Sequence, residues 1–340
     1  MGRLSIVLVM ALALAGGIIT YSINLSKRYT VENVVGFDKY TMARNIAHTG
    51  VNLMLHQLDQ GDTSFINRLN RGETCWLVKN VLTGICSVSV RLTSPAALDT
   101  VDLTSKSLYV DTTYNMRLRL QRFPKPFPAV GSAVGLASSP LEFSMSGTPN
   151  IDGRDHLMNG GLTASRARDT IGIAVFSAAE SITVSAYNSK ITGDPLKVKI
   201  QPIDDPGLYV DEYINGADYQ FPTGNYSGNY GSASSPVIGY VHGDVKFTGN
   251  GDFYGVLVVN GSIDMQGTYD IYGLVICTGD QNTVETSAGT PAIHGGVIVT
   301  GVDSKFVMKG TAAVQYSTEA LNMAKYISKL LAYKVMKWYE

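Results

Sequence analysis

The sequence predicts a mainly β protein with a long N-terminal α-helix, and three features of its 340 residues support this class. The first is an uncharged apolar segment, residues 4–25, which continues into a helical pattern as far as residue 60. The second is a set of runs within residues 74–122 in which apolar and polar side chains alternate, as in half-buried strands. The third is a regular spacing of glycines between residues 243 and 279.

The composition argues against nucleic-acid binding and against catalysis. With 27 basic and 28 acidic residues, the chain lacks the basic surface that indicates a nucleic-acid partner. The sequence contains no G-x-S-x-G, H-E-x-x-H, P-loop or dinucleotide-binding motif, and its five histidines are scattered. We therefore expect a structural protein that is not an enzyme, needs no cofactor and binds no nucleic acid.

Residues 4–25 predict a segment that is hidden from water. At a rise of ~1.5 Å per residue this span reaches ~33 Å, enough to cross the apolar core of a bilayer. The alternative is a cleavable signal peptide, with small-residue sites at residues 11–13 or 13–15. Because the apolar character continues well beyond those sites, we expect the segment to be retained as a membrane or filament-core helix.

Beyond residue 27 the apolar side chains recur at steps of three and four residues, as on one face of an amphipathic helix. Gly61 is suited to a left-handed helix cap, so residues 4–60 are expected to form one helix ~85 Å long within a first domain, 1–61. The apolar first part needs lipid or other helices around it, whereas the amphipathic second part needs a globular domain against which to pack.

This arrangement resembles the N-terminal helix of type IV pilins and minor-pilin-like proteins. Residues 43–53, Ala-Arg-Asn-Ile-Ala-His-Thr-Gly-Val-Asn-Leu, are similar to the segment that follows the membrane span in that family. The resemblance implies a processing site after Gly2, although Val7 stands where the family carries a glutamate five residues beyond the cleavage-site glycine. It also implies insertion in the inner membrane, then assembly with copies of itself or other pilin-like subunits through residues 4–60.

Residues 62–139 are expected to form a small β-rich domain that ends in a linker rich in proline, glycine and serine. The predicted strands are Trp76–Val78, Ser87–Leu92, Val101–Leu103 and Tyr114–Leu120. Cys75 and Cys86 flank the first predicted turn, and in an exported protein they would close a small disulfide loop. Two thiols that remain reduced are the alternative.

Residues 150–156, Asn-Ile-Asp-Gly-Arg-Asp-His, form the segment with the most metal-like chemistry. Asp152, Asp155 and His156 place two carboxylates and an imidazole within five residues, which makes them candidate cation ligands. Asp-Gly is also a common turn sequence, so a turn held by hydrogen bonds is the alternative.

The strongest pattern lies in the third predicted domain, a β-rich head over residues 140–316. Glycines recur every six residues, at Gly243, Gly249, Gly255, Gly261, Gly267, Gly273 and Gly279. Segments that start at Gly249, Gly267 and Gly289 align at offsets of 18 and 22 residues. The pattern predicts a parallel β-helix from about residue 236, with three strands of six residues in each turn.

Two further expectations concern this β-helix. The residues that precede the glycines are mostly not aliphatic, which favours a right-handed coil. Residues 317–340 have an apolar face and are expected to form a C-terminal amphipathic helix that caps the coil. A glycine-rich β-helix of this kind also follows the pilin-like helix in large minor-pilin-like proteins, so the resemblance covers both ends of the chain.

Two functions remain open at this point. The first is a structural subunit of a type IV pilus-like cell-surface filament or a secretion pseudopilus, with the β-helix head exposed. The second is a membrane-anchored β-helix adhesin that binds a surface glycan or an envelope partner through the tyrosine-rich residues 209–240.

Overall fold

The computed structural model describes residues 2–60, 63–94, 97–125, 127–208 and 210–339. The chain divides into two compact units, the first with residues 1–58, 68–121 and 333–340 and the second with residues 59–67 and 122–332. The helices are α1 (Gly2–Asp59), α2 (Thr63–Asn70), α3 (Ala178–Ser185), α4 (Val210–Asn215) and α5 (Thr318–Lys325), with short 3-10 helices η1 (Arg166–Arg168), η2 (Asn188–Lys190), η3 (Pro206–Leu208) and η4 (Ser328–Leu330).

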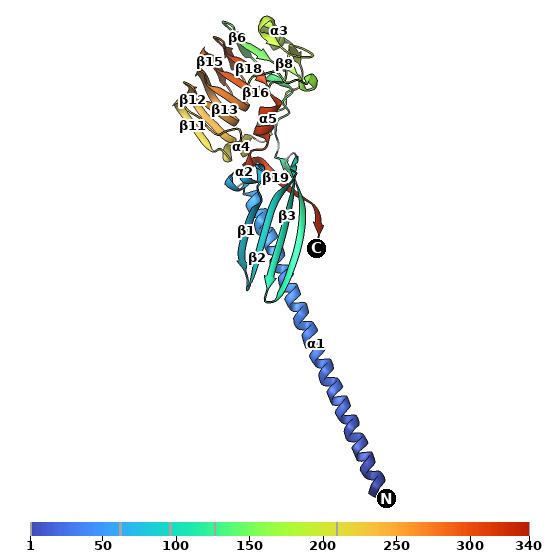
Figure 1. Cartoon of the computed structure of the whole chain (residues 1–340). Coiled ribbons are helices and arrows are strands. Elements are labelled where there is room, and N and C mark those ends of the chain that lie inside the picture. Colours follow the sequence, from blue (N-terminus) through green and yellow to red (C-terminus); the bar gives the residue numbers. More distant parts are fainter. Residues whose placement is uncertain (1, 61–62, 95–96, 126, 209, 340) are drawn as a thin grey trace. The chain divides into compact units, whose positions relative to one another are not determined.

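The prediction of one long N-terminal helix is confirmed, because α1 runs without interruption from Gly2 to Asp59 (Figure 1). Its two halves differ in burial. Every residue from 6 to 38 is exposed, whereas Ala43, Ile46 and others on one face of the second half are fully buried. The predicted cap at Gly61 lies outside the described residues.

A five-stranded sheet covers the second half of α1 (Figure 1), and its pairings β1–β2, β2–β3 and β3–β4 are antiparallel. Its strands follow the order β1 (Cys75–Val81), β2 (Gly84–Ser94), β3 (Ala97–Tyr109), β4 (Thr112–Pro124) and β19 (Leu331–Tyr339). The four strand segments predicted from alternating residues all lie within β1 to β4 and are confirmed.

Small residues let the helix and this sheet approach closely. The Ser105 and Ser107 hydroxyls donate hydrogen bonds to the carbonyls of Ala47 and Ala43, at 3.0 and 2.6 Å. Gly50 faces the sheet at a point where any side chain would collide with the Cys86 thiol. The buried face of α1 therefore packs closely against this sheet, and a larger side chain at Gly50 would not fit.

The predicted C-terminal capping helix over 317–340 is wrong for most of its length. The helix α5 ends at Lys325, and residues 331–339 form the strand β19 beside β4. The physical reason is that the open edge of β4 offers backbone hydrogen bonds to a segment rich in aromatic and branched residues. The second unit is thus inserted between two neighbouring strands of the first sheet.

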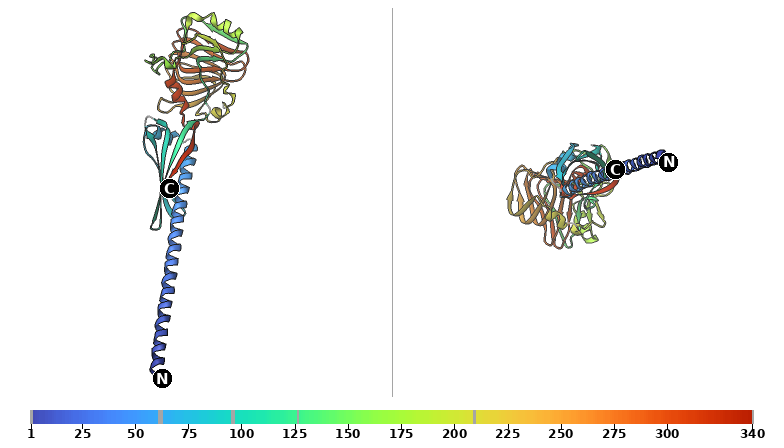
Figure 2. Two further views of the ribbon diagram at one scale, coloured as in Figure 1. Left: turned by 90° about the vertical axis from the view of Figure 1, so that its right-hand side faces the viewer. Right: turned by 90° about the horizontal axis from the view of Figure 1, so that it is seen from below.

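The second unit contains a strongly curled sheet of fourteen strands (Figure 2). Neighbouring strands of this sheet pair in parallel. Its strands are β5 (Ser132–Leu136), β6 (Leu141–Met145), β7 (Asn150–Asp152), β8 (Ile171–Val175), β9 (Ile191–Thr192), β10 (Val198–Ile200), β11 (Tyr219–Tyr226), β12 (Val237–Phe247), β13 (Asp252–Gly267), β14 (Asp270–Cys277), β15 (Thr283–Gly289), β16 (Ala292–Val299), β17 (Ser304–Met308) and β18 (Ala313–Tyr316).

The register of this sheet follows the predicted repeat. Val237 pairs with Gly255, and Asp252 with Asp270, both offsets of 18 residues, while Asp270 pairs with Ala292 at an offset of 22. Identical positions of successive repeats therefore stack, and rows such as Phe253, Ile271 and Ile293 form the interior. The fold class, mainly β with a long N-terminal helix, is confirmed, while the handedness of the coil stays a prediction.

The predicted start of this parallel sheet at about residue 236 is wrong. β5 pairs directly with β16, so that Val134 lies beside Val297, although residues up to 139 were expected to be linker. β6, β7, β8, β9, β10 and β11 also join before residue 236. These strands lack the glycine spacing, so nothing in their local sequence indicates that they continue the repeat.

Candidate functional site

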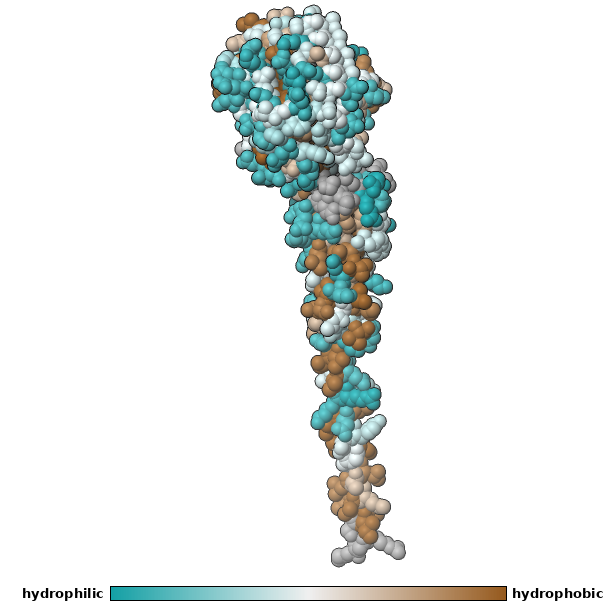
Figure 3. All heavy atoms as spheres, turned by 90° about the vertical axis from the view of Figure 1, so that its left-hand side faces the viewer, coloured by the Kyte–Doolittle hydropathy of each residue, from teal (hydrophilic) through white to brown (hydrophobic). Residues whose placement is uncertain are grey.

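The exposed half of α1 is the most unusual surface of the protein. Its apolar side chains include Leu14, which is 68% exposed, and Ile18, which is 67% exposed. Figure 3 shows hydrophobic side chains along the part of α1 that extends beyond the first sheet. The helix is long and apolar enough to cross a membrane. Exposing one such side chain to water rather than burying it costs about 1.5–3 kcal/mol, so this surface needs a cover.

A polar band marks the end of the membrane-length segment. Arg28 and Glu32 form an exposed ion pair of 2.9 Å one turn apart on α1. Beyond it, aliphatic and aromatic side chains return to the exposed helix surface, and Phe37 is 72% exposed. The first contact with the sheet follows at Lys39, whose ammonium lies 3.0 Å from the Asp111 carboxylate.

The predicted cation ligands around residue 152 are each engaged by protein donors. The Asp152 carboxylate accepts hydrogen bonds from the Arg154 guanidinium, with the shortest at 2.6 Å. Burial opposes ionisation of Asp152, but Arg154 outweighs it and holds the pKa of this carboxyl below its ordinary value. The carboxylate of Asp155 instead accepts from the backbone and hydroxyl of Thr318, at 2.8 and 2.9 Å.

His156 takes part in the same network of hydrogen bonds. Its Nδ1 lies 2.6 Å from the Arg154 carbonyl, and its Nε2 lies 3.5 Å from the Asp152 carboxylate. Among the described residues, no three His, Cys, Asp or Glu side chains are arranged to hold a metal ion. The observed contacts fit the alternative interpretation, in which the hydrogen bonds of Asp152, Asp155 and His156 hold a turn.

The predicted disulfide between Cys75 and Cys86 is wrong. In the β1–β2 pair, Cys75 lies opposite Val90 while Cys86 lies opposite Lys79, so four residue pairs separate the two thiols along the strands. A disulfide needs Cα atoms within about 7 Å, which this register does not allow. Burial raises the pKa of both thiols. Gly2 is the first residue of α1, and its processing stays a prediction.

The tyrosine-rich segment packs largely against itself at the β11 end of the parallel sheet. The Phe221 ring lies 5.0 Å from the rings of Tyr226 and Tyr230 and 5.3 Å from that of Phe247. Phe247 in turn stacks on Tyr269 at 4.9 Å. These rings cover the end of the apolar interior, and glycan binding by this segment stays a prediction. Tyr209 lies outside the described residues.

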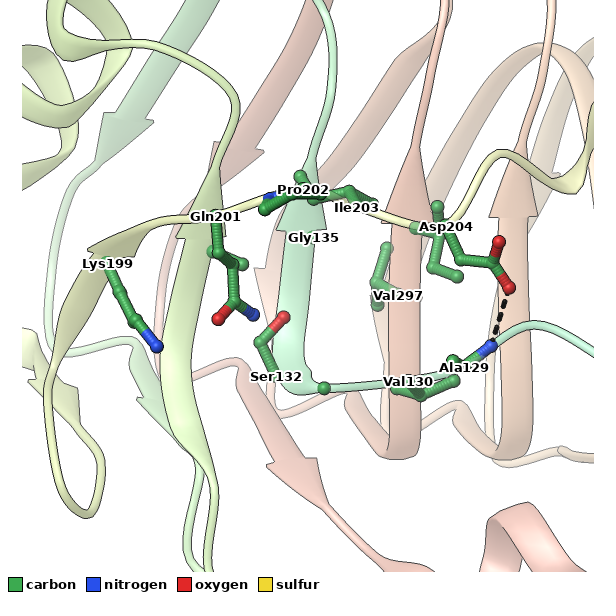
Figure 4. A pocket seen from close by; sticks show the side chains of 13 residues that line it. Ala129, Val130, Ser132, Gly135, Lys199, Gln201, Pro202, Ile203, Asp204 and Val297 are labelled. Carbon is green, nitrogen blue, oxygen red and sulfur yellow. Dashed lines mark hydrogen bonds between the residues drawn. The ribbon is translucent and has the colours of Figure 1, made fainter.

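A cavity of about 690 Å³ opens on the outer surface of the parallel sheet (Figure 4). Gly135 and Ala174 form its floor, because they carry little or no side chain where the neighbouring strand has Ile298. Lys199, on β10, and Gln201, just after that strand, line the cavity with their side chains, and Pro202 to Asp204 then cross over the sheet (Figure 4). Sequence reasoning missed this cavity, because four separate segments without a motif build it.

Comparison with known proteins adds little to this geometry. No protein-family model and no curated protein matches the chain. Among solved structures, the competence-associated pilin ComZ from Thermus thermophilus aligns over 88% of this chain and 97% of its own, with 9% sequence identity and a TM-score of 0.29. A similarity at that level carries no argument about family or function, so the functional conclusion rests on the chain's own surfaces.

Proposed function

We propose that this chain is a structural subunit of a type IV pilus-like cell-surface filament or pseudopilus, assembled through α1. One observation carries the proposal: a single unbroken helix is buried under its own sheet in one half and exposes apolar side chains in the other. The exposed half would lie in the inner membrane before assembly and pack against sister or other pilin-like helices afterwards. The parallel sheet would then face outward, with a structural rather than an enzymatic role.

The length of the exposed region favours a filament over a simple membrane anchor. A transmembrane helix needs about 20 apolar residues, which residues 4–25 already supply. The helix nevertheless continues fully exposed to residue 38, and it presents Tyr29, Val34 and Phe37 to solvent. An anchor leaves these side chains in water, whereas neighbouring subunits in a filament would cover them.

Deletion of residues 1–26 tests the proposal. We expect the shortened chain to be a soluble monomer that is absent from filaments, because both compact units keep their own buried interiors. The measurement is electron microscopy of sheared surface material, with membrane fractionation of the full chain as the control. Filaments that assemble normally without these residues would contradict the proposal, and a full chain found only in membranes would favour the anchored adhesin instead.

A further inference from the structure

Two turns at one end of the antiparallel sheet expose aliphatic side chains. Leu82 in the β1–β2 turn is 71% exposed, and Val110 in the β3–β4 turn is 67% exposed. Both turns lie at the same end, since Ile85 at the start of β2 pairs with Leu108 at the end of β3. Ile85 and Leu108 are exposed as well. We call these four residues the aliphatic tip.

The backbone at the two turn residues is also unfavourable. Leu82 has φ of +53° and Val110 has φ of +57°, in the left-handed region. Glycine and asparagine adopt this conformation readily, whereas a β-branched valine is an outlier there. The chain therefore keeps aliphatic side chains where both the backbone and the surrounding water favour another residue. Strain held at an exposed position is an indication of function.

The aliphatic tip lies beside the exposed part of α1. Asp111, next to Val110, binds the Lys39 ammonium at 3.0 Å, and the ring of Tyr40 lies 5.4 Å from that of Tyr114 on β4. Figure 1 shows the turns of this sheet alongside α1 at the place where the helix leaves the sheet. The tip therefore lies beside the exposed apolar surface of the helix, which includes Phe37 and Tyr40.

A lipid bilayer does not reach this surface when α1 stands upright in the membrane. Lys39 lies 14 residues beyond Leu25, the last residue of the apolar segment, which is about 21 Å along the helix. The headgroup region adds only about 5–8 Å on each side of the hydrocarbon core. A cover for the tip would therefore be a protein surface rather than lipid.

We propose that the aliphatic tip is a docking surface for a second copy of this chain, where it receives the exposed residues 29–37 of that copy's α1. The inference rests on the proposed function and names a contact within the filament. The two surfaces are both apolar and both exposed in the single chain. The aliphatic tip and residues 29–37 are different surfaces, so their contact joins two chains head to tail. A head-to-tail contact that does not close into a ring propagates as a filament.

The test replaces Leu82 and Val110 together with asparagine in the full chain. Asparagine relieves the left-handed strain, so the melting temperature of the detergent-solubilised monomer should rise by about 3 °C or more. The yield of sheared filaments should nevertheless fall by about tenfold or more. The matched control is Val302→Asn, which changes an exposed aliphatic turn residue of the second unit with ordinary φ and should leave the yield unchanged.

Cysteine cross-linking gives a second readout that needs no filaments. One population carries Val110→Cys and the other Phe37→Cys, so a disulfide between the new thiols joins two chains. We expect disulfide-linked heterodimers when membranes holding both populations are oxidised, and none when Val302→Cys replaces Val110→Cys.

The outcomes separate this inference from the proposed function. Normal filament yield from the double asparagine variant, with filaments still dependent on residues 1–26, would overturn the docking surface alone. If the melting temperature falls together with the filament yield, Leu82 and Val110 serve folding. This result would also overturn the docking surface. If the unaltered chain forms no filaments, the proposed function fails, and the heterodimers then decide the docking surface by their presence or absence.

Discussion

The two compact units bury their apolar residues in opposite ways. The second unit closes its own interior, because successive parallel strands stack identical positions and rings such as Phe221 and Phe247 cover one end. The first unit leaves half of α1 and the aliphatic tip in contact with solvent. Each unit meets the same demand to remove apolar surface from water. The difference is that the second unit closes its interior within one chain, whereas in the proposed filament the exposed half of α1 would be covered by neighbouring subunits.

The largest expected effect concerns the tight stacking of the second unit. In Gly295→Ala, the new methyl group would collide with the carbonyl oxygen of Gly273, and φ at this position is +138°. We expect the free energy of unfolding to fall by about 4 kcal/mol or more. The matched control is Gly249→Ala, where φ is +86° but the methyl group meets no atom, and the expected loss is about 1–2 kcal/mol.

Urea denaturation followed by circular dichroism measures both glycine variants. Equal losses for Gly295→Ala and Gly249→Ala would contradict the interpretation that backbone contact between successive turns, rather than φ alone, requires glycine there.

A smaller effect separates the two halves of α1. Ile46 is fully buried under the sheet, so Ile46→Ala should lower the free energy of unfolding of the detergent-solubilised chain by about 2–4 kcal/mol. Ile18 is 67% exposed on the same helix, so Ile18→Ala should change the free energy of unfolding by no more than about 0.5 kcal/mol. Urea denaturation in one detergent checks both. A comparable loss at Ile18 would mean that the first half of α1 packs within the chain.

The smallest expected effect is a pH dependence inside the second unit. Burial raises the pKa of Asp270 from its ordinary 3.8 to about 6, while its oxygen accepts a hydrogen bond from the Ala292 amide at 3.0 Å. The folded chain thus holds the carboxyl proton more tightly than the unfolded chain. The stability that this proton contributes is complete below pH ~4 and is lost as the pH rises through about 6.

Asp270→Asn keeps the acceptor oxygen and removes the charge. We therefore expect its melting temperature to exceed that of the unaltered chain at pH 7 and to equal it at pH 4. A variant that melts below the unaltered chain at pH 7 would show that the ionised carboxylate stabilises the sheet, contrary to this assignment.

The local sequence could predict features that repeat along the chain. The three- and four-residue steps of α1 and the absence of proline before Pro95 predict one helix, and the apolar segment predicts which half is not covered by the chain's own sheet. The glycines at six-residue intervals predict the parallel register, because equivalent positions of a repeat stack on one another. These features depend on neighbours in sequence or on a fixed period, and both are visible in a single chain.

Only the tertiary structure decided which distant segments pair. It placed β19 beside β4, added β5 to the edge of β16, and set Cys75 and Cys86 too far apart along β1 and β2 to form a disulfide. It also brought Leu82 and Val110 to one end of a sheet and assembled the cavity at Gly135. The physical reason is that an open strand edge accepts any suitable segment that can reach it, because every residue type except proline offers the same backbone donor and acceptor.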